Sequence, residues 1–271
     1  MSDWPALVDG EPAGLIEVTD ASVLRGDGCF EAVRSYGGAL FRLEDHLDRL
    51  ERSAAALELR VPDRSLLRGW SEQVARGDCI VRIVVSRGPA VPGAEGSERC
   101  IVLAHPLPDP PEEVRLWPVR APWHPAGRAW ELSGVKTISY APNLAAGRRA
   151  QAEGADDALL VTEEGVVLEG PTFSVGWWTG ERVSTPSLRL GILDSITRRV
   201  VRDLLPAMEE VEARLEDLEA ADEVFAMSTV KEVAPVVAVG STRFTAGPRT
   251  RDLAQRFAEL VRQLSTESQP R

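Results

Sequence analysis

Lys136 is the residue whose type and surroundings point most directly to chemistry. The chain contains only two lysines, Lys136 and Lys231, and a short, fairly apolar stretch precedes Lys136. A lysine held in such surroundings is partly desolvated, which lowers its pKa and makes its amine a nucleophile for carbonyl groups. A surface lysine near a strand end has the same local pattern. The local sequence therefore makes Lys136 a candidate for a carbonyl-reactive amine.

Two further charged residues could assist such an amine. Glu169 follows an expected strand and precedes the turn at Gly170 and Pro171. A carboxylate beside a pyridinium nitrogen keeps that nitrogen protonated, so that the ring accepts electrons. Arg49 lies in an expected helix, and a guanidinium can bind phosphate through two parallel hydrogen bonds. Taken alone, Glu169 also fits a turn carboxylate, and Arg49 fits a solvated helix arginine.

The residues around an expected helix start could bind a phosphate. Ser195, Ile196 and Thr197 open that helix, and a helix N-terminus offers free N–H groups and a positive dipole end. Ser228 and Thr229 follow an expected strand and could add hydroxyl and amide donors to the same phosphate. An ordinary N-cap gives the same pattern at Ser195.

Two arginines could bind a substrate carboxylate. Arg25 and Arg82 stand at or within apolar, strand-like segments, where a charge needs a partner. A structural ion pair is the alternative for each of them.

The elements expected around these residues are mixed helices and strands. Helices are expected at 43–59, 62–75, 144–153, 195–205 and 250–264. Strands are expected at 24–34, 39–42, 79–86, 99–105, 114–119, 158–162, 166–169, 173–178, 224–227 and 236–239, with short strands within 6–18. The absence of regular alternation favours an α+β fold with two lobes. Prolines crowd residues 106–125, which predicts an N-terminal lobe at 1–117, a linker at 118–128 and a C-terminal lobe at 129–271.

Composition narrows the class of protein. The net charge of −11 disfavours a nucleic-acid binder and attachment to an anionic membrane. No apolar stretch is long enough to span a bilayer, and the N-terminus does not read as a secretory signal. Three cysteines without metal-ligand spacing predict reduced thiols in a cytoplasmic protein. Three widely separated histidines give no support to a metal site.

A series of motifs follows in register along the chain. They lie at residues 25–31, 41–50, 136–143, 168–172, 185–186, 191–197 and 228–229. In their types and order these motifs resemble the class IV aminotransferase family, from about residue 6 to the last expected helix. That family includes branched-chain aminotransferases, D-amino acid aminotransferases, R-selective amine transaminases and aminodeoxychorismate lyases.

The resemblance implies a fold-type-IV enzyme that uses pyridoxal 5′-phosphate. It implies a smaller N-terminal α/β lobe, a larger C-terminal lobe with a pseudo-barrel, and a homodimer. Lys136 matches the lysine that binds the cofactor covalently and then moves the substrate's α-proton. Glu169 matches the carboxylate on the pyridine nitrogen, and Arg49 matches the arginine on the phosphate. The phosphate cup and its neighbours match Ser195, Ile196, Thr197, Ser228 and Thr229.

Two aromatic residues complete the site that the resemblance implies. Tyr140 is similar to the tyrosine near the phenolic oxygen of the cofactor. Phe30 stands where many transaminases have tyrosine or phenylalanine, which places it on the substrate side together with Arg25 and Arg82.

The sequence also departs from the family pattern. Ser174 stands where many members have asparagine, and residues 88–93 lack the arginine and histidine that trap the carboxylate in the typical D-amino acid enzyme. Arg25 and Arg82 could replace that trap. The function expected first is transamination between a D-amino acid or branched-chain amino acid and a 2-oxo acid. Aminodeoxychorismate lyase, which releases pyruvate and 4-aminobenzoate, is the second hypothesis, and an inactive cofactor-binding protein is the third.

Overall fold

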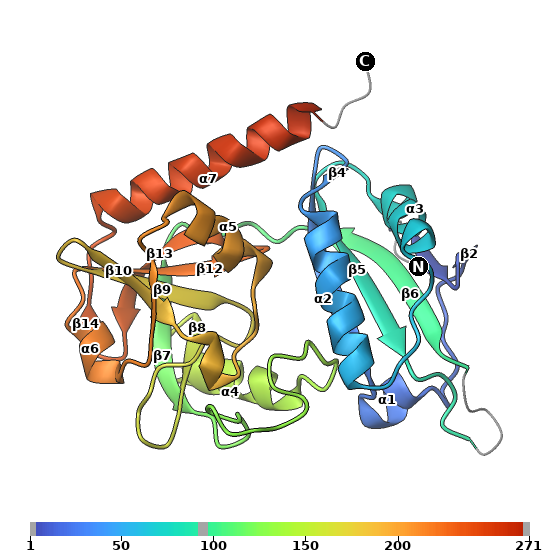
Figure 1. The fold of residues 1–271 in the computed structure, drawn as a ribbon, viewed down its shortest axis with the longest axis horizontal. Helices are drawn as coiled ribbons and strands as arrows, with labels where there is room; N and C mark the ends of the chain where they lie inside the picture. The colour runs from blue at the N-terminus through green and yellow to red at the C-terminus, as the bar shows by residue number, and fades with distance from the viewer. Residues whose placement is uncertain (1–3, 92–96, 268–271) are drawn as a thin grey trace. The chain divides into compact units, whose positions relative to one another are not determined.

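Two compact units make up the fold. The computed structural model describes residues 4–91 and 97–267, so positions 92 and 93 of the 88–93 loop lie outside the described residues. Chain up to Pro108, the segment Val135–Tyr140 and chain from Val261 form the first unit. Asp109–Gly134 and Ala141–Leu260 form the second (Figure 1). These units differ from the expected domains. The boundary falls at Pro108 because the strand at 114–120 joins the second sheet, and Lys136 belongs to the first unit.

The first unit contains a six-stranded sheet in which all neighbours are antiparallel. In sheet order its strands are β2 (Glu11–Pro12), β1 (Ala6–Val8), β6 (Arg99–Pro106), β5 (Cys79–Ser86), β3 (Gly28–Tyr36) and β4 (Ala39–Leu40). Its helices are α1 (Ala21–Arg25), α2 (Leu43–Ala56) and α3 (Arg64–Val74).

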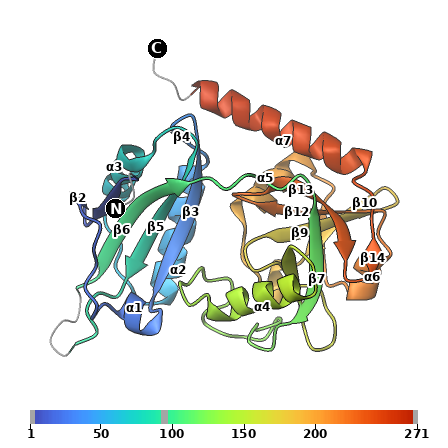
Figure 2. The ribbon, with the colours of Figure 1, turned by 180° about the vertical axis from the view of Figure 1, so that it is seen from behind.

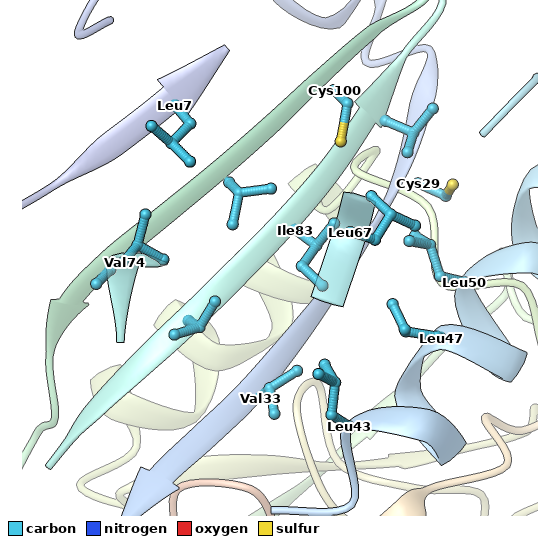
Figure 3. Packing of buried hydrophobic residues seen from close by; sticks show 14 of the residues in the cluster. Leu7, Cys29, Val33, Leu43, Leu47, Leu50, Leu67, Val74, Ile83 and Cys100 are labelled. Atoms are coloured by element: carbon cyan, nitrogen blue, oxygen red, sulfur yellow. The ribbon is translucent and has the colours of Figure 1, made fainter. Parts of the chain in front are cut away.

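The core of this unit lies between the sheet and helix α2. Leu43, Leu47 and Leu50 recur at helical spacing on one face of α2. They point toward Val33 and Ile83 on the strands, and all five side chains are buried (Figure 3). Cysteines 29, 79 and 100 are buried free thiols, and Cys29 and Cys100 are among the core residues that Figure 3 labels.

The opposite face of the sheet carries the residues that concern function. Successive strand residues point to opposite faces, so Phe30 and Arg34 of β3 lie on the face away from Val33. Ala32 pairs with Arg82 of β5, which brings Arg82 to that same face. Strand alternation therefore gathers one aromatic ring and two guanidinium groups outside the core.

The short segment Val135–Tyr140 pairs with the first half of β3. The Phe30 N–H donates to the Lys136 carbonyl (3.0 Å), and the Ile138 N–H donates to the Gly28 carbonyl (3.0 Å). An antiparallel bridge joins Cys29 to Thr137 between them. Lys136 is thus held by strand pairing, which explains why it belongs to the first unit.

The second unit contains a mixed sheet of eight strands. In sheet order they are β11 (Glu209–Val211), β10 (Arg182–Pro186), β9 (Ser174–Thr179), β12 (Glu223–Ser228), β13 (Glu232–Val239), β7 (Val114–Arg120) and β8 (Asp157–Val161), with β14 (Thr242–Arg243) beside β13. Its helices are α4 (Ala141–Ala152), the 3-10 turn at Leu188–Leu190, α5 (Ile196–Leu204), α6 (Leu215–Glu219) and most of α7 (Pro248–Glu267). Helix α4 packs against β7 and β8 (Figure 2).

Most expected elements are confirmed, and two expectations are wrong. Residues 24–34 are not one strand, because Asp20 caps helix α1 and Gly26 ends it in the left-handed conformation before β3 begins. Residues 166–169 form only isolated bridges, at Val166 and Val167. Within the described residues, no helix is long and apolar enough to cross a membrane.

Candidate active site

The amine of Lys136 lies among aromatic rings. Its Nζ is 3.3 Å from the Tyr140 hydroxyl and 4.4 Å from the centroid of the Phe30 ring. Phe30 and Tyr140 meet edge to face, with centroids 5.2 Å apart. The Lys136 N–H also donates to Ser53 Oγ on α2 (3.2 Å). Strand pairing and a helix hydroxyl therefore hold the backbone of Lys136, and two aromatic residues contact its amine.

Arg82 approaches the same Phe30 ring. Its guanidinium carbon is 5.1 Å from the ring centroid. Within the described parts of the chain, its buried Nε has no hydrogen-bond partner. A buried charged donor needs an acceptor, so Arg82 suits a ligand carboxylate better than a structural ion pair.

Arg25 does not have the setting expected from the sequence. It is the last residue of α1 and is exposed, not part of an apolar strand. An exposed guanidinium is solvated and needs no protein partner, so the expectation that Arg25 lies in an apolar strand is wrong.

Arg49 belongs to a buried charged cluster. Its Nε and Nη2 donate to the two carboxylate oxygens of Glu31, each at 2.7 Å. His46 Nδ1 lies 2.7 Å from Glu31 Oε2. Burial alone would raise the pKa of Glu31, but Arg49 and His46 outweigh it and hold that pKa well below its usual range. Burial also lowers the pKa of His46, against its hydrogen bond to Glu31, so its neutral form is favoured. We define these three residues as the Glu31 cluster.

Glu169 lies in a different environment in the second unit. The Leu193 N–H donates to both of its carboxylate oxygens, at 3.2 Å each. His124 Nε2 stands 3.7 Å from Oε1. The side chain of Glu169 is 16% exposed, and that of His124 is 9% exposed. This carboxylate therefore has a backbone N–H and a histidine as its polar neighbours, and it is partly accessible to solvent.

The chain beyond Leu193 leads directly into α5. Ser195 caps the helix, and its hydroxyl accepts from the Arg198 N–H (3.3 Å). Ile196 and Thr197 are the first two helical residues, so their N–H groups have no acceptor inside the helix. The Arg198 side chain is fully buried and donates to the Thr185 hydroxyl (3.3 Å), which anchors the first turn on β10. One continuous segment thus positions both the Glu169 carboxylate and a helix N-terminus suited to an anion.

The second expected phosphate segment ends a central strand. Ser228 is the last residue of β12, and its hydroxyl accepts from the Lys231 N–H (2.9 Å), which closes the turn containing Thr229. The two expected parts of the phosphate cup therefore come from the N-terminus of α5 and the end of β12.

Sequence reasoning missed two residues at these carboxylates. Glu31 was detectable, because a buried carboxylate in a largely apolar stretch of strand needs a cation, and Arg49 and His46 share one face of the next helix. His124 gave no comparable signal. It lies in the expected linker at 118–128, and its proximity to Glu169 depends on the path of a loop.

Comparisons with known proteins agree with this architecture. Residues 28–239 match the family model described as amino-transferase class IV. The chain is 30% identical to a putative branched-chain-amino-acid aminotransferase from Methanocaldococcus jannaschii, covering 90% of this chain and 91% of that one. It is 27% identical to the aminodeoxychorismate lyase of Bacillus subtilis, covering 86% and 85%. It is 29% identical to a D-alanine aminotransferase of Listeria monocytogenes, covering 94% and 93%.

Solved structures give the same result. A fold IV transaminase from Curtobacterium pusillum superimposes with a TM-score of 0.85 at 28% identity, covering 93% of this chain and 90% of that one. The chain therefore belongs to the class IV aminotransferase family, whose members have the type IV fold and use pyridoxal 5′-phosphate. The substrates of this family's aminotransferases are amino acids and keto acids.

Proposed function

We propose that the protein is an aminotransferase that moves an amino group between a D-amino acid or branched-chain amino acid and a 2-oxo acid. One observation carries this proposal: Lys136 Nζ and the Arg82 guanidinium approach the same Phe30 ring, at 4.4 and 5.1 Å. An amino acid presents an amine and a carboxylate only a few ångströms apart. The first unit therefore offers a reactive amine and a carboxylate-binding cation within reach of one such molecule.

The described side chains fit pyridoxal 5′-phosphate chemically. Lys136 offers an amine for its carbonyl, and Glu169 offers a partly exposed carboxylate for its ring nitrogen. The free N–H groups at the start of α5 suit its phosphate. Further phosphate ligands are proposed at Ser195, Ile196, Thr197, Ser228, Thr229 and Arg49. Tyr140 is proposed beside the phenolic oxygen.

Lys136 then has a second role, as the general base at the substrate's Cα. Bound pyridoxal 5′-phosphate supplies a ring that accepts the electron pair left by the departing α-proton. Lys136 Nζ would take that proton, and Tyr140, whose hydroxyl lies 3.3 Å from Nζ, would keep the amine oriented. The Phe30 ring shields the amine from water on one side.

Arg82 would bind the substrate by its carboxylate. A charge-assisted hydrogen bond is short and strong, and the Nε of Arg82 has no acceptor among the described residues. Arg25 remains a proposal only as a solvent-exposed residue that a carboxylate could approach. Assembly as a homodimer in the cytoplasm is part of the same proposal, and sedimentation of the purified protein tests the dimer.

Lyase activity on aminodeoxychorismate is the second candidate function. Similarity to the Bacillus subtilis lyase over 86% of this chain favours it, as do residues 25–28 and 169–172, which resemble those of lyases. The same lysine and cofactor would serve, and Arg82 would bind a carboxylate of the cyclic substrate. Arg82 therefore does not separate the two reactions.

A half-reaction separates them. D- and L-amino acids are each mixed with the pyridoxal form of the protein, and absorbance is followed toward the pyridoxamine form. Conversion by either stereoisomer is the expected result. Pyruvate release from aminodeoxychorismate without conversion by any amino acid would instead support the lyase.

Two variants test the residues behind the proposal. Lys136→Ala should lose turnover by orders of magnitude while still binding cofactor noncovalently, and near-normal turnover would disprove the assignment. Arg82→Ala should raise the KM for carboxylate substrates roughly tenfold to a hundredfold, since a hydrogen bond to a charged group contributes about 1.5–3 kcal/mol. Arg99→Ala is the matched control, because Arg99 lies on β6 in an exposed ion pair with Asp9.

A further inference from the structure

His124 faces Glu169 from a loop between β7 and α4. Its Nε2 lies 3.7 Å from Glu169 Oε1, which is longer than a direct hydrogen bond. A small rotation of the carboxylate would bring the two atoms within hydrogen-bond distance. The Leu193 N–H contacts the same carboxylate, so His124 is its second polar neighbour.

The backbone determines which nitrogen of His124 carries the proton. The Ala126 N–H donates to His124 Nδ1 at 3.2 Å. An Nδ1 that accepts a hydrogen bond cannot itself carry a hydrogen, so the proton of the neutral ring lies on Nε2. The Nε2–H therefore points to the side of the ring where Glu169 lies.

The same contact opposes a positive charge on His124. A protonated ring carries hydrogens on both nitrogens, and a hydrogen on Nδ1 would meet the Ala126 N–H. His124 consequently acts as a neutral donor. A cation at this position would compete with a protonated pyridine nitrogen for the Glu169 carboxylate, whereas a neutral N–H donor steadies the carboxylate and leaves its charge available.

Local backbone geometry indicates that this arrangement has an energetic cost. Ala126 has a φ of +51°, in the left-handed region that a non-glycine residue rarely adopts. Hydrogen bonds hold the loop in place on both sides of that residue. The His124 N–H donates to the Ala121 carbonyl (2.9 Å), and the Gly127 N–H donates to the Leu190 carbonyl (3.0 Å). Strain retained beside a polar contact is typical of functional sites.

The geometry points to His124 as a positioning residue for Glu169: its Nε2–H orients the carboxylate toward the cofactor's ring nitrogen without adding a competing charge. This inference rests on the proposed function, because it assumes that Glu169 meets that nitrogen. It adds a residue that the motifs resembling the family do not contain.

The tautomer can be measured on the unaltered protein. With only three histidines in the chain, ¹⁵N-histidine spectra are simple, and His124→Gln identifies the signals of His124 by their loss. The expected result at neutral pH is a protonated Nε2 and a bare Nδ1, in the apoprotein and with pyridoxal 5′-phosphate bound. A proton on Nδ1, in a neutral or a cationic ring, would overturn the inference.

Variants test the consequence for the cofactor. His124→Phe should lower kcat about tenfold, leave the KM for the amino acid within about twofold, and raise the Kd for pyridoxal 5′-phosphate about tenfold, as expected for one lost donor to a charged group. His124→Gln keeps an N–H donor at a similar position and should restore most of each value. His105→Gln, at an exposed contact on β6, is the control and should change none of them.

Glu169→Gln separates this inference from the proposed function. If Glu169→Gln leaves kcat and cofactor affinity unchanged, the assignment of Glu169 to the ring nitrogen fails. If Glu169→Gln impairs both while His124→Phe matches the unaltered protein, only the role of His124 is overturned. Loss of thermal stability in His124→Phe without rescue by His124→Gln shows a structural role and also overturns it.

Discussion

Two glutamates in this molecule each have a histidine neighbour, yet their environments are opposite. Glu31 is fully buried, and a bidentate arginine and His46 saturate its two oxygens. Glu169 is partly exposed and contacts one backbone N–H and His124. The charge of Glu31 is compensated by a guanidinium inside the protein, whereas the contacts described for Glu169 are a backbone N–H and a histidine.

The difference distinguishes a carboxylate with a structural role from a carboxylate that is available to bind a ligand. A carboxylate that is already paired with a guanidinium has little charge left for a ligand, and it fixes the guanidinium in place. A carboxylate with neutral donors keeps its charge available for an incoming cation such as a protonated ring nitrogen. We therefore expect Glu31 to determine stability and Glu169 to determine activity.

The largest expected effect is on stability and concerns Glu31. Glu31→Gln leaves Arg49 as a buried charge without its counter-ion, which should lower the free energy of unfolding by about 3–5 kcal/mol. Urea denaturation of the apoprotein measures it. Glu169→Gln is the matched control in the second unit. If it lowers the free energy of unfolding as much as Glu31→Gln does, the proposed difference between the two glutamates is wrong.

The next effect is on catalysis and concerns Glu169. Glu169→Gln should lower kcat by about 10²–10³-fold, the usual result of losing one electrostatic contact to a developing charge, with stability changed by less than about 0.5 kcal/mol. Single-turnover kinetics with an amino acid provide the measurement. An unchanged kcat would mean that the two glutamates do not differ in the way described.

Acid should weaken the Glu31 cluster in two stages. Folding lowers the pKa of His46 from its ordinary 6.5 and that of Glu31 from its ordinary 4.5. For both groups the folded pKa lies below the unfolded one, so their contribution to stability is complete above the unfolded pKa and is lost as the pH falls. Stability should therefore decline as the pH falls below 6.5, and decline further below pH 4.5. Denaturation midpoints between pH 8 and pH 4 test this. In His46→Phe the first decline should disappear, whereas His124→Phe should retain it.

The smallest effect concerns the loop beside His124. Ala126→Gly removes the cost of a positive φ while keeping the N–H that faces His124, so stability should rise by up to about 1 kcal/mol with kcat unchanged. Thermal unfolding and a kinetic assay are sufficient. A fall in kcat would show that the rigidity of this loop contributes to turnover, and that positioning of Glu169 depends on more than the donor.

The sequence predicted most of the fold because most of its signals are local. The leucine spacing of α2 and the apolar run of β5 mark their own elements. Arg25 was misplaced because its segment is apolar, and only Gly26 in the left-handed conformation shows that a helix ends there. Local sequence alone left Lys136 ambiguous, because its pairing with β3 joins residues far apart in the chain.

Site residues were harder to predict where position depends on loops. Glu169 and Ile196 lie in motifs that can be read in order, but their link through Leu193 appears only in three dimensions. His124 lies in a proline-rich stretch that reads as a linker, so no periodicity marks it. What could not be predicted is the set of contacts between segments that carry no regular pattern.

The pairing of Val135–Tyr140 with β3 has a consequence for how this gene can change. The chain passes between the two units after Pro108, Gly134, Tyr140 and Leu260. A gene fragment that ends at Pro108 would encode the first sheet without the strand that carries Lys136. A fragment that begins at Asp109 would encode that lysine without the strand beside which it lies. Neither unit can be exchanged with that of a relative as a single gene fragment. Recombination that keeps Lys136 beside β3 must therefore preserve the chain passages after Gly134 and after Tyr140.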